Sequence, residues 1–157
     1  MIYVIDTSSL SVLKTYYKGV FGSFWIHFDN LVTEGRLISV KEALKESDKN
    51  IDSEHLQQWI TSNKSIFLPP RSKQETEFLR EIFAVPHFKQ LIPQKHLLTN
   101  KPVADPFVIA AAKVRNGCVV TEEKNKTGAA KIPNVCDHFN IQWTNIEGMM
   151  KKEKWNF

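Results

Sequence analysis

Four consecutive apolar residues, Ile2 to Ile5, open the chain and run directly into an acid, Asp6. A continuous apolar run of this length has no polar face to turn toward water, so it is typical of a strand buried on both faces of a parallel sheet. Leu37–Val40 and Cys118–Thr121 are short runs of similar character. Helices must cover both faces of a sheet built from such strands. The sequence therefore predicts an α/β fold.

Helical periodicity lies between these strands. Large apolar residues recur three and four positions apart from Phe21 to Val32, which places them on one stripe of a helix that ends at Gly35. Further helices are expected over 41–47, around Leu56–Ile60, around Phe78–Phe83 and from Asp105 to Gly117, with brief strands at Ser65–Leu68 and Ile141–Trp143. Residues 86–103 contain three prolines and are expected to form the least regular stretch, a surface excursion.

Composition narrows the class of protein. The chain has 157 residues and a formal net charge of +4, which suits one domain over residues 1–157 and permits a polyanionic partner without demanding one. The two cysteines, Cys118 and Cys136, are too few for a disulfide framework. No apolar run approaches the ~20 residues of a membrane span, and the chain opens without a leader pattern. We expect a cytoplasmic protein with no membrane association.

Acidic residues follow the predicted strands. Asp6 follows the first strand, Glu42 and Glu46 follow the second, and Glu122 and Glu123 follow the strand that ends at Thr121; Asp105 stands at the start of a predicted helix. In open parallel sheets, ligands bind beyond the carboxyl ends of the strands. Carboxylates that converge there repel one another unless a cation joins them, and hard divalent cations such as Mg²⁺ or Mn²⁺ prefer oxygen ligands.

Each acid also has an ordinary structural interpretation. Asp105 followed by Pro106 is a favourable N-cap with proline at the first helical position. Asp6 could accept backbone hydrogen bonds in the turn that follows it, and the glutamates could be solvated surface acids. Taken one at a time, these interpretations are favoured over a metal site.

Three segments, Tyr3–Ser8, Ala104–Lys113 and Val119–Glu123, together resemble the PIN domain, and the match extends in order across nearly the whole chain. It is most similar to a branch of uncharacterised bacterial and archaeal PIN-like proteins. The resemblance implies a three-layer α/β/α sandwich with a central, mainly parallel sheet. It also implies an endoribonuclease that cleaves single-stranded RNA with Mg²⁺ or Mn²⁺, and often the toxin half of a VapC-like type II toxin–antitoxin pair.

The resemblance assigns roles by position. Asp6, Glu46, Asp105 and Glu123 match the acids that bind metal and carry catalysis, although the last position usually holds aspartate. Glu42 remains an alternative to Glu46 because the two are i,i+4 neighbours on one helix face. Matching residues of lesser weight are the supporting hydroxyls Thr7 and Thr121 and the polar residue Asn125.

The expected partners are an RNA substrate, a cognate antitoxin and a second copy of the chain. Lys101, Lys124, Lys126 and Lys131 lie near the acids in sequence and could bind phosphates. No Ser/His or Cys/His pair stands out as a nucleophile with its base, which leaves the acids to carry the chemistry. The alternative function is a PIN-like module that binds RNA or a protein without cleaving.

Overall fold

The sheet has five strands, and all neighbouring strands are parallel. The computed structural model describes residues 1–157. Its strands are β1 (Tyr3–Ile5), β2 (Leu37–Val40), β3 (Phe67–Leu68), β4 (Cys118–Val120) and β5 (Gln142–Thr144), in the order β3-β2-β1-β4-β5. Each adjacent pair has parallel register. The predicted α/β class is confirmed, and the central sheet is wholly parallel.

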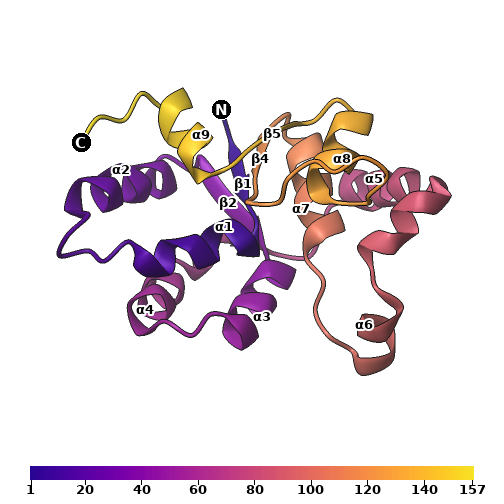
Figure 1. Ribbon diagram of the computed structural model, residues 1–157, viewed down its shortest axis with the longest axis horizontal. Coiled ribbons are helices and arrows are strands. Elements are labelled where there is room, and N and C mark those ends of the chain that lie inside the picture. The colour runs from indigo at the N-terminus through magenta and orange to yellow at the C-terminus, as the bar shows by residue number, and fades with distance from the viewer.

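Helices cover both faces of this sheet (Figure 1). One layer contains α1 (Thr7–Val12), α2 (Gly22–Thr33), α3 (Lys41–Asn50), α4 (Glu54–Ser62) and α9 (Ile146–Lys152). The other contains α5 (Lys73–Ala84), α7 (Asp105–Val114) and α8 (Ile132–His138). The remaining helical segments are the 3₁₀ turns η1 (Leu13–Thr15), η2 (Lys64–Ile66) and η3 (Pro86–Leu91), and the short helix α6 (Gln94–Thr99). The three-layer α/β/α arrangement is therefore present.

The strand order places a topological switch point between β1 and β4. From β1 the chain moves outward through β2 to β3, and then returns through α5 and α7 to β4 on the other side of β1. Because the two connections leave in opposite directions, the carboxyl ends of β1 and β4 border a crevice, which is where open α/β sheets bind ligands. Asp6 and Thr121 are the residues that directly follow these two strands.

Burial explains why these residues form the centre of the fold. Every residue of β1 and β4 is buried, as the absence of a polar face in each run predicts. Helix α7 contributes three consecutive buried alanines, Ala110 to Ala112, whose small side chains let the helix pack closely on β1, β2 and β4. Gly35 follows α2 with φ +68°, a left-handed conformation that favours glycine after a helix.

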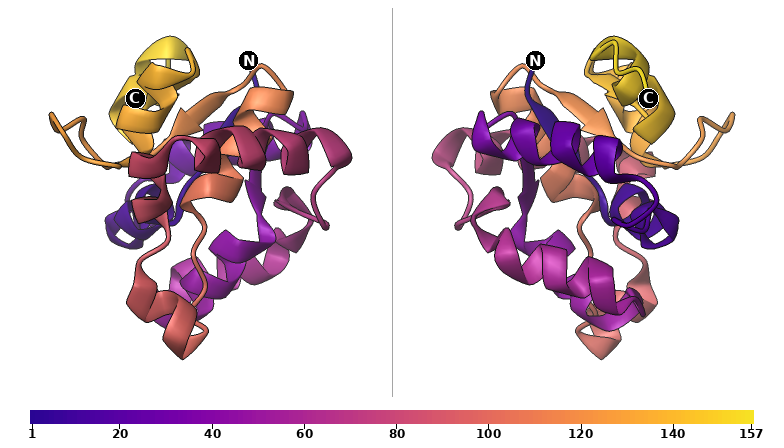
Figure 2. Two further views of the ribbon diagram at one scale, coloured as in Figure 1. Left: turned by 90° about the vertical axis from the view of Figure 1, so that its right-hand side faces the viewer. Right: turned by 90° about the vertical axis from the view of Figure 1, so that its left-hand side faces the viewer.

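Four parts of the chain are more ordered than the sequence pattern predicts: α1, the stretch 86–103, α8 and the C-terminal residues. The stretch 86–103 contains η3 and α6, and Phe88 and Leu91 of η3 are buried in the core. In Figure 2 α6 lies beyond the carboxyl edge of the sheet, at the bottom of both views. The C-terminal residues form α9, where Met149 is fully buried. No helix of the structure has the length and apolar character that crossing a membrane requires.

Candidate metal centre

Three carboxylates meet at the switch point. Asp6, Glu46 and Asp105 each offer one oxygen, and these oxygens lie within 4.8 Å of one another. The residues are 40 to 99 positions apart in sequence and come from the end of β1, from α3 and from the first residue of α7. They meet because the parallel strands deliver the chain to the same edge of the sheet.

Asp6 is held by hydroxyl groups and by the start of α1. It is only 4% exposed, and its Oδ2 accepts a hydrogen bond from the Ser8 hydroxyl (2.7 Å), one from the Ser8 amide (3.4 Å) and one from the Thr121 hydroxyl (3.3 Å). Asp6 is thus the N-cap of α1 as well as a member of the acid cluster. The hydrogen bonds that Asp6 accepts as an N-cap are therefore compatible with its position in the acid cluster.

The structure separates Glu46 from Glu42. The Thr7 hydroxyl donates to Glu46 Oε1 over 3.2 Å, on the side of α3 that faces α1. Glu42 instead accepts from Arg71 over 3.0 Å, and the guanidinium of Arg71 lies 4.3 Å from the centre of the Phe107 ring. Glu42 therefore has its own cation and lies outside the cluster.

Asp105 is not the N-cap of its helix. It occupies the first helical position of α7, Ala104 is the capping residue, and no side chain makes a capping hydrogen bond there. The interpretation of Asp105 as an N-cap is therefore wrong. Its carboxylate nevertheless benefits from the first turn of α7, where the partial positive charge of the helix favours an anion.

The consecutive glutamates after β4 diverge. Glu123 Oε2 accepts from the Ile132 amide over 2.8 Å, and Glu123 lines a hollow together with Asp105. Glu122 Oε1 accepts from the Ile146 amide (3.0 Å) and the Ser9 hydroxyl (3.3 Å), so it anchors the start of α9. Glu123 therefore adjoins the cluster of three without belonging to it, and Glu122 points elsewhere.

The three lesser candidates, Thr7, Thr121 and Asn125, have different outcomes. Thr7 and Thr121 each donate to a clustered acid, as supporting hydroxyls would. Asn125 is exposed and donates to Asp137 over 2.5 Å, so it ties its loop to α8 and does not join the acids.

Sequence reasoning missed Ser8. Its hydroxyl donates to Asp6 and accepts from the Glu122 amide over 3.1 Å, which joins the ends of β1 and β4. The signal was present in the succession Asp6-Thr7-Ser8, where a hydroxyl two residues after a buried acid at a helix start can return to it.

Burial raises the pKa of four acids at this edge, Asp6, Glu46, Asp105 and Glu123, and repulsion from neighbouring carboxylates adds to the rise in the last three. The pKa of Asp105 rises to about 8 because the residue is desolvated and lies near Asp6, Glu123 and Glu46. Desolvation and the charge of Asp6 raise the pKa of Glu46 to about 7, although the Thr7 hydroxyl and the Ala104 amide oppose the shift. Burial also raises the pKa of Asp6 and of Glu123.

The donor set fits a hard divalent cation. The three clustered groups are all carboxylates, and none of them forms an ion pair with a Lys, Arg or His side chain within 4.0 Å. A cation of charge +2 would replace the missing counter-charge. Mg²⁺ and Mn²⁺ accept two or three carboxylates and keep water in their other positions.

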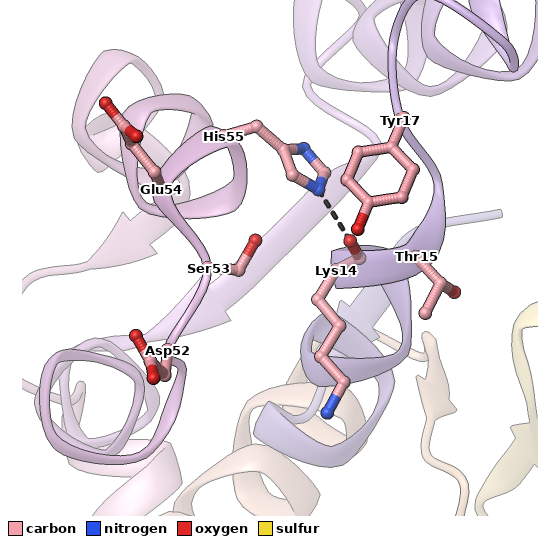
Figure 3. A pocket seen from close by; sticks show the side chains of 7 residues that line it. All are labelled: Lys14, Thr15, Tyr17, Asp52, Ser53, Glu54 and His55. Atoms are coloured by element: carbon pink, nitrogen blue, oxygen red, sulfur yellow. Dashed lines mark hydrogen bonds between the residues drawn. The ribbon is translucent and has the colours of Figure 1, made fainter.

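A separate hollow of about 450 Å³ lies between η1 and the start of α4. The His55 imidazole lies 2.7 Å from the Lys14 carbonyl there (Figure 3). Figure 3 shows the carboxylates of Asp52 and Glu54 and the ammonium of Lys14 pointing in different directions. Because the charged groups do not converge, this hollow lacks the geometry of the acid cluster.

The family comparison covers almost the whole chain. Residues 3–157 match the family model described as Domain of unknown function (DUF4411). The chain belongs to the DUF4411 family. Its acid cluster therefore lies within the region that defines the family. No curated protein matches the chain.

One solved structure is distantly similar, "Crystal structure of PAE2754 from Pyrobaculum aerophilum". It is 14% identical in sequence, and the match covers 90% of this chain and 98% of that chain with a TM-score of 0.37. A likeness this remote carries no conclusion about the site, so the functional argument depends on the geometry of the acids.

Proposed function

We propose that the chain is a PIN-like, metal-dependent endoribonuclease that hydrolyses phosphodiester bonds of single-stranded RNA with Mg²⁺ or Mn²⁺. The observation that carries the proposal is the set of three carboxylates within 4.8 Å, without a cationic side chain, at the switch point of a parallel sheet. An isolated group of buried charges of one sign destabilises the fold, so its presence calls for a charged ligand.

Asp6, Glu46 and Asp105 would hold the cation, and Glu123 would approach from the rim of the adjoining hollow. A divalent cation supplies positive charge where the phosphate oxygens gain negative charge, and it makes nearby water more acidic. The chain supplies the orientation. Ser8 and Thr121 fix the carboxylate of Asp6, and Thr7 fixes that of Glu46.

Lysines near the acids support a polyanionic substrate. A hollow of about 370 Å³ between α3 and the segment after α6 is lined by Lys45, Lys49 and Lys101, with Glu42 and Asp48 among the other lining residues. Lys131 lines the hollow beside Asp105. Exposed lysines such as these can bind the phosphates of a strand, while the acids alone would repel it.

The decisive experiment is cleavage of a labelled single-stranded RNA by the purified protein. We expect cleavage with Mn²⁺ or Mg²⁺, none in EDTA, and a loss of at least about a hundred-fold in Asp6→Asn, which is ~2.7 kcal/mol of barrier. Glu42→Gln is the matched control, because Glu42 is paired with Arg71 outside the cluster.

Each outcome of this experiment is informative. Activity that survives EDTA and Asp6→Asn would contradict the proposal. Metal-independent retention of RNA without cleavage would favour the alternative of a binding module.

The biological role proposed with this activity is the toxin of a type II toxin–antitoxin module, with an antitoxin and a second copy of the chain as partners and the cytoplasm as its location. This role depends on the PIN-like resemblance. Induced expression in a bacterial host should arrest growth for the wild type and not for Asp6→Asn at equal protein level. Equal growth of the two strains would remove the toxin role and leave the nuclease proposal intact.

A further inference from the structure

A hollow of about 340 Å³ adjoins the acid cluster at Asp105 and Glu123. One wall comes from η3 and the residue before α6, with Gln90, Leu91 and Pro93. The other wall comes from the loop before α8, with Ala129, Ala130 and Lys131. Figure 2 shows this loop projecting from the side of the molecule, in orange. Two segments that the sequence does not predict to form regular elements thus enclose a space beside the acids.

Lys131 is the one cationic residue among those that line this hollow. It is exposed, and it forms no ion pair within 4.0 Å. It lines the same hollow as Asp105 and Glu123. An ammonium group without an ion-pair partner, next to carboxylates that lack a counter-charge, can bind a phosphate group.

The rest of the hollow suits a nucleobase. Leu91, Ala129 and Ala130 provide apolar surface, and Pro93 adds a ring. Gln90 is exposed and makes no side-chain hydrogen bond in the structure, so its amide is free both to donate and to accept. The volume of about 340 Å³ lies near the lower end of the ~300–1,000 Å³ of small-ligand sites, which suits a single nucleotide.

We propose that this hollow is a subsite for one nucleotide of a single-stranded substrate, in which Lys131 binds the phosphate adjacent to the scissile one and Gln90 contacts the base. The inference rests on the proposed function, because the acids define which phosphate is cleaved. It makes Lys131 and Gln90 substrate-binding residues and makes the hollow a source of preference among bases.

The phosphate contact is tested by the salt dependence of binding. We would measure the affinity of a fluorescein-labelled single-stranded RNA by anisotropy, with Ca²⁺ in place of Mn²⁺ and the RNA checked for integrity on a gel. Removing one phosphate contact to a single strand reduces the slope of log K against log[salt] by about 0.7. Lys131→Ala should show this reduction and about a ten-fold higher KM in cleavage with Mn²⁺, and Lys131→Arg should recover both.

Lys89→Ala is the matched control, because Lys89 is an exposed lysine of η3 that does not line the hollow. It should leave the slope and KM at the wild-type values. A wild type that cleaves RNA, with Lys131→Ala equal to it in slope and KM, overturns the subsite and spares the proposed function. A wild type that binds RNA but never cleaves it overturns the proposed function, while the change in slope still decides the phosphate contact. A wild type that does neither overturns both.

The base contact is tested by mapping cleavage sites on RNAs of mixed sequence. Gln90→Ala should change the preference at one position next to the cut by about ten-fold, which corresponds to ~1.4 kcal/mol. Gln94→Ala is the control, because Gln94 is nearby and exposed but does not line the hollow. An unchanged pattern in Gln90→Ala would overturn the base contact.

Discussion

Carboxylates are buried or half-buried in two regions of the chain, and only one of these regions pairs them with a cationic side chain. Between α5 and α7, Glu75 is 5% exposed and accepts from both terminal nitrogens of Arg115 at 3.2 Å. Ser72 donates to it as well, at 3.3 Å. At the switch point, Asp6, Glu46 and Asp105 share one small volume with no cationic partner. The first region shows that this fold can neutralise a buried acid, and the missing counter-charge in the second region supports the proposed metal site.

The two regions also differ in what the sequence reveals. Ser72 is the N-cap of α5, and its hydroxyl accepts from the Glu75 amide. This contact joins residues three positions apart, so it can be recognised in the sequence. The acid cluster cannot be recognised in this way, because its members come from three distant segments.

The comparison predicts opposite stability effects for the same chemical change, and this is the largest expected difference. Glu75→Gln should lower the free energy of unfolding by roughly 1.5 kcal/mol, or about 3–6 °C in Tm, because Arg115 loses its charged partner. Asp105→Asn should raise Tm at pH 8 in EDTA, because it removes one of the repelling charges. Thermal unfolding of both variants beside the wild type gives the answer. A lower Tm for Asp105→Asn would contradict the contrast.

A scan of four glutamates tests which ones belong to the charged region. Glu46→Gln and Glu123→Gln should each reduce metal-dependent cleavage by about ten-fold or more, equivalent to ~1.4 kcal/mol of barrier. Glu122→Gln should be near neutral, because glutamine can still accept from the Ile146 amide. Glu42→Gln should also be near neutral, because Glu42 pairs with Arg71. The cleavage rates of the four variants at one Mn²⁺ concentration test these expectations. An inactive Glu122→Gln would contradict the site described above.

A pH dependence of the metal-free protein is also expected. The pKa values of about 7 for Glu46 and about 8 for Asp105 exceed the ordinary values of 4.5 and 3.8. Between these limits the folded state keeps protons that the unfolded state has released, so the free energy of unfolding falls as pH rises from about 4 to about 8. Below pH 4 both states are protonated, and this contribution is constant.

Thermal unfolding in EDTA at pH 5.5 and pH 8.5 measures this dependence. Tm should be lower at the higher pH, and Asp105→Asn should show a smaller difference between the two. Mn²⁺ should restore Tm at pH 8.5, because a ligand that binds only the folded state stabilises it. An equal pH dependence in Asp105→Asn and wild type would show that Asp105 is not the group responsible.

The strands and the principal helices follow from the sequence because their signals are local. A continuous apolar run must be buried on both faces, and a stripe with helical spacing must face the core. The stretch 86–103 was harder to predict, because its prolines suggest irregular structure. In the structure Phe88 and Leu91 are buried, and the Phe88 ring packs against His138 and Phe139 at the end of α8. The C-terminal helix was missed for a similar reason, because its seven residues give too short a period to recognise.

By itself the sequence determined the α/β class and the placement of acids after the strands. Only the tertiary structure decided between Glu42 and Glu46, which are equivalent on a helix until packing on α1 turns one toward Asp6 and leaves the other to Arg71. It also placed Asp105 inside its helix and brought Lys131 and Gln90 to one hollow. The physical reason is that whether a strand or helix is buried follows from the residues of that segment alone. Which charged side chains meet depends on how segments distant in sequence pack against one another, and the free energy of that packing cannot be assigned to one segment.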